Sequence, residues 1–179
     1  MKRIVLTLSL LVLFTGLCFS GGYSQVNREE RLKAPQLTVK PINRDEKCQI
    51  GGPNDKYTVL LFWTTWCPHC AVAMEDMNNY FRQYKDKVRF CGIAVGEDPV
   101  KVASYIASRG IKFPVVVDER GEIGYIYGIM GVPTIFVIDR EGYVVDYGYV
   151  LPRIIRRLMS FLEQEEEQGG RHDGRSDQG

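Results

Sequence analysis

The sequence predicts an α/β domain built on a central mixed β-sheet flanked by helices. Three observations predict it. Short apolar segments rich in β-branched residues alternate with longer segments whose apolar residues recur at helical spacing. Near the end of the chain, two strand-like segments are separated by a tight turn. A last amphipathic segment follows them. Alternating strands and helices favour parallel strand pairs, and the hairpin adds antiparallel ones, so the sheet is mixed.

The composition is that of an ordinary globular protein. Of the 179 residues, 45% are hydrophobic and 25% are charged, which argues against a disordered chain or one with several membrane spans. The 23 basic and 22 acidic residues almost cancel, so charge gives no reason to expect a nucleic-acid partner. The length is sufficient for one domain with a real core.

The first residues have the pattern of a secretory signal. Lys2 and Arg3 precede an apolar stretch that ends near residue 19, and small residues suited to cleavage follow. We predict that this segment directs the protein to an extracytoplasmic location, periplasmic or secreted, and is either removed or kept as a membrane anchor. A lipid-modified Cys18 is a further alternative. The predicted divisions are a signal peptide or anchor at 1–24, a linker at 25–34, the domain at 35–167 and a polar, disordered tail at 168–179.

The elements of the domain follow in order. Leu37 and Val39 alternate with polar residues and suit an edge strand, and turn-rich segments surround Cys48. The segment from Tyr57 to Trp63 is apolar throughout, as in a strand buried on both faces. The later segments are predicted as a helix at 68–84, a strand at 88–95, a helix from 97 to about 109, a strand at 113–117, a short helix at 122–127, strands at 134–138 and 143–149, and a helix from 152 to about 168.

Two cysteines stand where the first buried strand gives way to the first helix. Cys67 and Cys70 are two residues apart, a spacing that can close a small disulfide with little backbone movement. The N–H groups at a helix start stabilise an anion, and the thiolate is the nucleophile of disulfide exchange. We therefore predict Cys67 as the exposed attacking thiol and Cys70 as the thiol that resolves the mixed disulfide. Between them, Pro68 suits the first helical position, and His69 favours the thiolate.

The spacing of these two cysteines has two other interpretations. A purely structural disulfide is compatible with the spacing. A zinc site needs a second pair of ligands, and the only histidines are His69 and His172. We expect no metal and no cofactor beyond the redox-active Cys67–Cys70 disulfide itself.

The segment from Phe62 to Cys70 resembles the active-site segment of the thioredoxin superfamily, and Gly131-Val132-Pro133-Thr134 resembles its loop with a cis-proline. More narrowly, the segments at 95–97, 113–118 and 133–139 are similar to extracytoplasmic thioredoxins of the TlpA/ResA type. The resemblance covers about residues 35–163. It implies a thioredoxin-like fold, thiol–disulfide exchange with exported proteins, and in many members a reducing role in cytochrome c maturation.

The resemblance also implies partners and a place for substrate. A cis-Pro133 facing the thiols would leave the backbone of Val132 free to pair with an extended peptide. The alternative is that Pro133 merely starts an edge strand. Trp66, next to the thiols, is expected to cap the site and contact substrate. The expected partners are exported proteins with disulfides or dithiols, including apocytochrome c, and a membrane electron donor similar to CcdA or DsbD.

Three departures from the family pattern bear on the direction of electron flow. Thioredoxin-like proteins often place a buried acid where this chain has Leu61, and TlpA/ResA-type members often place a glutamate where it has Ala73. Glu75 is nearby, but it is most simply a solvated carboxylate. Third, Pro68-His69 is the pair that DsbA-type oxidases carry. The hypothesis is a TlpA/ResA-like reductant. The alternatives are a DsbA-like oxidase and a redox-inert peptide-binding module.

The two remaining cysteines of the domain are Cys48 and Cys91. If Cys67 pairs with Cys70, they are each other's only partners within the domain, so they are a candidate structural disulfide. The alternative is that Cys91, in the middle of a strand, is a free buried thiol that packs as a small hydrophobe.

Overall fold

The computed structural model describes residues 31–173 of the chain, and their side chains as far as residue 165. The predicted signal peptide or anchor at 1–24 lies outside the described residues, as does the end of the predicted tail. Among the described residues, no helix is long and apolar enough to cross a membrane.

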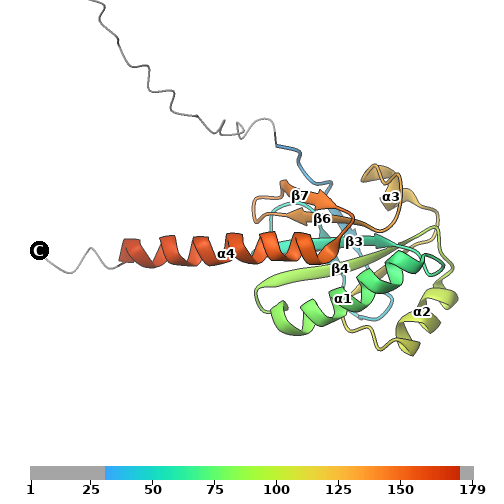
Figure 1. Ribbon diagram of the computed structural model, residues 1–179. Helices are drawn as coiled ribbons and strands as arrows, with labels where there is room; N and C mark the ends of the chain where they lie inside the picture. The colour runs from blue at the N-terminus through green and yellow to red at the C-terminus, as the bar shows by residue number, and fades with distance from the viewer. Residues whose placement is uncertain (1–30, 174–179) are drawn as a thin grey trace, which may run out of the picture.

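The α/β prediction is confirmed by a five-stranded mixed sheet in the order β5-β4-β3-β6-β7 (Figure 1). Strand β3 (Tyr57–Trp63) is parallel to β4 (Val88–Val95), which is parallel to β5 (Val115–Asp118). On the other side of β3, strand β6 (Thr134–Ile138) is antiparallel to it and pairs with β7 (Val144–Gly148). Strand β3 is therefore central and is buried along its whole length.

Within residues 31–173, four helices connect or follow the strands. They are α1 (Pro68–Tyr84), α2 (Pro99–Ser108), α3 (Glu122–Ile126) and α4 (Leu151–Asp173). The prediction for α1 is confirmed at both ends. Helix α2 begins at Pro99 because the Asp98 side chain caps it by accepting a hydrogen bond from the N–H of Lys101 at 2.9 Å.

Different elements pack on the two faces of the sheet. Residues of α1, α2 and α4 pack on one face in a large apolar cluster that includes Leu61, Trp63 and Ile135. On the opposite face, a smaller cluster joins Leu60, Phe62 and neighbouring residues to the segments around α3 and to a separate two-stranded ribbon. Successive residues of β3 thus point to opposite faces, as the pleat of a strand requires.

That ribbon consists of β1 (Leu37–Val39) and β2 (Cys48–Ile50), which are antiparallel. The strand at Leu37 and Val39 was predicted, but β2 was not. Its three residues lie between turn-rich segments and include the polar Gln49, so periodicity gives no signal there. Pairing with β1 and burial of Ile50 define this strand.

Several boundaries differ from the sequence prediction. Strand β5 begins at Val115 rather than residue 113 because Pro114 has no N–H to donate to the sheet. Helix α4 continues to Asp173, so the prediction that a disordered tail begins at residue 168 is wrong. Once a helix is formed, each added residue gains a hydrogen bond, and the Gln- and Glu-rich run carries it past Gly169. Figure 1 shows the second half of α4 projecting away from the sheet.

Candidate active site

Cys67 is the residue that caps the N-terminus of α1. Its backbone is extended, with φ −88° and ψ 115°, and its sulfur accepts a hydrogen bond from the N–H of Cys70 at 3.2 Å. Pro68 follows in the first turn, where a missing N–H costs nothing. The N-terminal N–H groups carry partial positive charge, so this contact stabilises negative charge on the Cys67 sulfur.

The expectation that Cys67 is an exposed thiol is wrong. The residue is only 7% exposed, although its neighbours Trp66, Pro68 and His69 are exposed. Two contacts cover it. The hydrogen bond from the first turn holds the sulfur over the helix end, and the loop before β6 lies against it, with the carbonyl oxygen of Val132 3.8 Å from the sulfur. A partner must therefore approach Cys67 past this loop.

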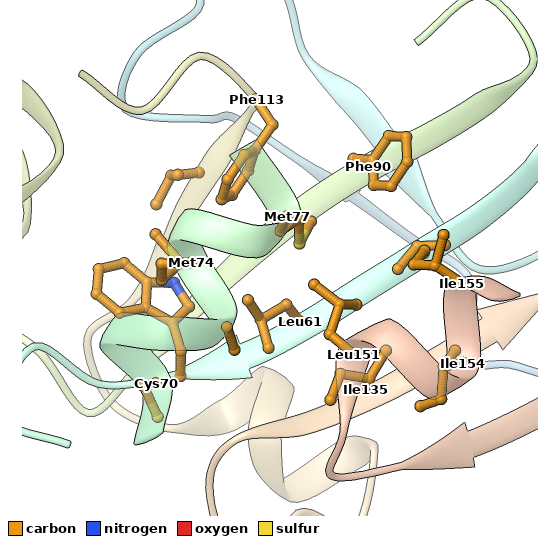
Figure 2. Close-up of a cluster of buried hydrophobic side chains, with 14 of the residues drawn as sticks. Leu61, Cys70, Met74, Met77, Phe90, Phe113, Ile135, Leu151, Ile154 and Ile155 are labelled. Carbon is orange, nitrogen blue, oxygen red and sulfur yellow. The ribbon is translucent and has the colours of Figure 1, made fainter. Parts of the chain in front are cut away.

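Cys70 lies one turn inside α1 and is fully buried. Figure 2 shows it on the first turn of the helix, at the edge of the apolar cluster that includes Met74 and Leu61. Burial, reinforced by the hydrogen bond with Cys67, raises the pKa of the Cys70 thiol to about 12. Cys70 is therefore protonated at neutral pH, and its thiol donates to the sulfur of Cys67. The two sulfurs are thus chemically unequal.

The loop facing the thiols contains a cis peptide bond between Val132 and Pro133, as the resemblance implied. The hydroxyl of Thr134 donates to the carbonyl of Gly131 at 2.6 Å and closes the turn. Pro133 leads into β6, which lies between β3 and β7. The alternative that Pro133 merely starts an edge strand is therefore wrong, because β6 has a hydrogen-bonded neighbour on each side.

A groove lies along α1 and begins at His69, the residue just before Cys70. Its cavity has a volume of ≈ 520 Å³. The lining residues come from α1, from the cis-proline loop and from the segment before α4: His69, Val72, Val132, Pro133, Tyr149 and Val150. Because Val72, Tyr149 and Val150 expose apolar side chains, the groove suits an extended peptide with apolar residues.

The two positions where the family pattern often has a carboxylate are occupied by apolar residues in this chain. Leu61 is buried in the apolar cluster, and Ala73 is buried on α1. Glu75 is exposed on the helix, in agreement with the solvated role predicted for it. Asp76 lines the groove instead, and burial, followed by the nearby charge of Glu75, raises the pKa of its carboxyl.

Sequence reasoning missed the structural role of Glu97, which is buried just beyond the end of β4. Its carboxylate accepts hydrogen bonds from the backbone N–H of Thr65 at 2.9 Å and from the Thr65 hydroxyl at 2.9 and 3.1 Å. Lys101, one turn along α2, lies 3.6 Å from the same carboxylate. Glu97 thus anchors the loop that delivers Cys67. The sequence did contain a signal for this contact. Thr65 and Glu97 each follow one of two neighbouring parallel strands, and the carboxyl ends of such strands meet at one edge of a sheet.

Cys48 and Cys91 lie elsewhere, on the opposite face of the sheet from Cys67 and Cys70. Both are free thiols, and they line the same small cavity. The structure therefore brings together the two residues named as a candidate disulfide, without joining them covalently. Among the described residues, no group of His, Cys, Asp and Glu side chains has the arrangement of a metal site.

Comparison with known proteins places this geometry in a family. The family described as AhpC/TSA matches residues 31–147. The thiol-disulfide oxidoreductase ResA of Bacillus cereus strain ATCC 10987 is 34% identical over 144 residues, which cover 79% of this chain and 82% of the relative. ResA of Bacillus subtilis strain 168 is 29% identical over 139 residues, covering 76% of this chain and 77% of the relative.

Solved structures show the same fold. A putative protein disulfide isomerase from Bacteroides thetaiotaomicron superposes with a TM-score of 0.66 at 23% identity, covering 79% of this chain and 92% of that one. StoA from Bacillus subtilis gives a TM-score of 0.58 at 24% identity, covering 64% and 87%. The fold is thioredoxin-like, and the protein is a thiol–disulfide oxidoreductase. The chain belongs to the AhpC/TSA family and, within it, is related to the ResA proteins.

Proposed function

We propose that this protein is an extracytoplasmic reductant that transfers two electrons from Cys67 and Cys70 to disulfides of exported proteins. The observation that carries the proposal is the inequality of the two sulfurs. The sulfur of Cys67 accepts a hydrogen bond from the N–H of Cys70 at the N-terminus of α1, whereas deeper burial keeps Cys70 protonated. An attacking thiol and a resolving thiol require these opposite properties.

In the first step, the thiolate of Cys67 attacks one sulfur of the substrate disulfide. A bond forms between Cys67 and that sulfur, the substrate disulfide breaks, and the second substrate sulfur leaves as a thiolate that takes up a proton. The substrate peptide lies in the groove beside Val132 and Pro133, where the backbone can pair with an extended chain. The Val132 carbonyl beside the Cys67 sulfur supports this placement.

In the second step, Cys70 loses its proton and attacks the Cys67 sulfur. The mixed disulfide breaks, the substrate's first sulfur leaves as a thiol, and Cys67 and Cys70 end as a disulfide. The substrate has gained two electrons and two protons. Because burial keeps Cys70 protonated, this step needs a base, and among the residues that line the groove Asp76 supplies a carboxyl. A membrane dithiol protein similar to CcdA or DsbD would return the electrons.

The proposed substrates and location follow from relatives and from the N-terminal pattern. The relatives are named thiol-disulfide oxidoreductases, and a structural neighbour from Chlorobium tepidum is a putative DsbE-type interchange protein. We infer that the substrates include apocytochrome c and other exported proteins. The signal-like residues 1–24 support export, with or without a retained anchor.

A DsbA-like oxidase is the second candidate, because the exposed Pro68-His69 pair is what such oxidases carry. The reduction potential of the Cys67–Cys70 pair separates the two, measured by equilibrating the protein in dithiothreitol and glutathione redox buffers. A value near or below about −270 mV supports the reductant, and one near about −120 mV supports the oxidase and overturns the proposed direction.

A redox-inert peptide-binding module would use the same groove without turnover. Insulin reduction by wild type and by Cys67→Ser, with dithiothreitol as electron source, tests this. We expect the variant to lose at least about 1000-fold in rate above the uncatalysed background, because a serine hydroxyl is a poor nucleophile. Cys48→Ser, which removes a thiol on the other face of the sheet, is the control and should keep full activity. Equal rates for wild type and Cys67→Ser would sink the mechanism.

A further inference from the structure

A second pair of thiols lies on the face of the sheet away from the active site. Cys48 is in β2 of the ribbon, and Cys91 is in the middle of β4, opposite Leu60 of β3. Both belong to the smaller apolar cluster, which also contains Ile50. Packing of the ribbon on the sheet places both side chains on the lining of one small cavity. Two cysteine side chains that meet in this way form a disulfide when rotation brings their sulfurs within bonding distance.

The two thiols are as unequal as those of the active site. Cys91 is buried, whereas Cys48 is partly exposed. The hydrogen bond from Cys91 lowers the pKa of the Cys48 thiol to about 7, with a smaller contribution from Arg89, and partial burial opposes this shift. The same hydrogen bond, together with burial, raises the pKa of the Cys91 thiol. At neutral pH a large share of Cys48 is therefore thiolate, while Cys91 holds its proton.

Solvent has access to this pair. A cavity of ≈ 160 Å³ is lined by both cysteines and by residues of α1, β3 and β4. Two cations, Lys85 and Arg89, are among the lining residues. Arg89 also binds Asp55 at 2.7 Å, so part of its charge is neutralised. Positive charge beside a thiolate favours a small anionic disulfide such as oxidised glutathione as the reacting partner.

We propose that Cys48 and Cys91 are a second thiol–disulfide site, distinct from Cys67 and Cys70, whose disulfide fastens the β1–β2 ribbon to the central sheet. The thiolate of Cys48 attacks a disulfide RSSR, forms Cys48–S–S–R and releases one RS⁻. Cys91 then loses its proton and attacks the Cys48 sulfur, which releases the second RS⁻. The oxidant RSSR gains two electrons and becomes two thiols, and the protein loses two electrons and two protons.

The position of the bond gives it a consequence for the active site. The disulfide would close the chain from residue 48 to residue 91, a loop that contains β3, the Cys67–Cys70 pair and α1. Cross-linking a long loop stabilises the folded state mainly by restricting the unfolded chain. The proposed bond therefore braces the scaffold of the active site without touching its reacting atoms. This inference does not depend on the direction of electron flow proposed above.

The test uses the full chain with Cys67→Ser and Cys70→Ser, so that the active-site thiols cannot contribute. The protein is treated with excess oxidised glutathione at neutral pH, quenched in acid, and its remaining thiols are alkylated before peptide mapping by mass spectrometry. We expect one cross-linked peptide pair containing Cys48 and Cys91, which mapping separates from any product of Cys18. Alkylation of both cysteines overturns the proposal, as does stable glutathione on Cys48 with Cys91 alkylated.

The order of attack and the bracing effect are tested in the same background. Adding Cys91→Ser should trap glutathione on Cys48, whereas adding Cys48→Ser should leave Cys91 unmodified. Glutathione on Cys91 in the second variant would overturn the order. The oxidised parent should melt about 10 °C above its reduced form, and the Cys48→Ser form should show no such shift. This measurement does not need the Cys91 variant to fold. An unchanged melting temperature in the cross-linked parent would overturn the bracing.

Discussion

The two cysteine pairs are brought together in different ways, although each pair combines two unequal thiols. Cys67 and Cys70 are neighbours in sequence, and the start of α1 holds one sulfur against the N–H of the other residue. Cys48 and Cys91 are far apart in sequence, and the packing of the ribbon on the sheet holds them together. In each pair the pKa of one buried thiol is raised, mainly by burial for Cys70 and mainly by the interaction with Cys48 for Cys91.

The surroundings of the pairs differ more than their sulfurs do. The first pair opens onto an apolar groove of ≈ 520 Å³ beside the Val132 carbonyl, with room for a peptide. The second opens onto a cavity of ≈ 160 Å³ lined by two cations, where a small disulfide reagent fits better than a protein chain. The difference teaches that two pairs of unequal thiols are distinguished by the surfaces beside them, which set the size and charge of the partner that each pair can admit.

The largest predicted effect is on the rate of insulin reduction, which should depend on the Cys67–Cys70 pair and not on the Cys48–Cys91 pair. Cys70→Ser should lower insulin reduction by at least about 1000-fold, because Cys67 can still attack but no thiol of the protein resolves the mixed disulfide. When the reduced variant is mixed with substrate in the absence of dithiothreitol, a covalent complex should accumulate. Adding dithiothreitol should release it, as seen on non-reducing gels. Cys48→Ser should turn over like wild type. A slow Cys48→Ser enzyme would mean that the second pair takes part in the main reaction.

The next effect concerns Glu97, whose carboxylate holds the loop that leads to Cys67. Glu97→Ala leaves the half-buried Thr65 N–H without its charged acceptor, so the free energy of unfolding should fall by about 1–3 kcal/mol. Urea denaturation of the reduced protein measures it. Glu75→Ala, which removes an exposed carboxylate from α1, is the control and should change stability by less than about 0.5 kcal/mol. Equal losses in the two variants would contradict the anchoring role.

A smaller effect should appear in how stability depends on pH. The pKa of Cys48 is about 7 in the folded protein, below its ordinary value of 9.0, because Cys91 donates a hydrogen bond to it. The thiolate therefore stabilises the folded state above about pH 9, and this contribution is lost as the pH falls through 7. Since Cys48 is half-exposed and solvent screens its charge, the contribution should stay below about 1 kcal/mol.

Urea denaturation of the reduced wild type and of Cys48→Ser between pH 6 and pH 8.5 checks this dependence. The difference in unfolding free energy between them should grow as the pH rises. A difference that is flat, or that shrinks with rising pH, would show that the hydrogen bond does not favour the Cys48 thiolate.

The smallest effect concerns the groove. Tyr149→Ala should raise KM for a peptide disulfide about 3-fold and leave kcat unchanged, because the side chain contacts substrate equally in the ground and transition states. Tyr147→Ala is a matched control, because both tyrosines are 64% exposed but only Tyr149 lines the groove. A similar rise in KM for both variants would place the substrate elsewhere.

Much of the active site could be predicted from the sequence because its geometry is local. Cys67 and Cys70 follow a buried strand and open an amphipathic helix, so their place at the helix start comes from short-range periodicity and capping. The same applies to the bounds of β3, α1, β4 and β6, which were predicted correctly. The cis-proline at Pro133 came from the family resemblance rather than from any local rule.

What the sequence by itself determined was therefore the order of the helices and of the strands of the central sheet, and the place of Cys67 and Cys70 at the start of a helix. Only the tertiary structure decided that Cys67 is covered by the Val132 loop, that Glu97 holds Thr65, and that Cys48 meets Cys91. The physical reason is that each of these contacts joins segments distant in the chain. Strand order, register and the packing of the ribbon on the sheet set such contacts, and the periodicity of a short segment contains no information about them.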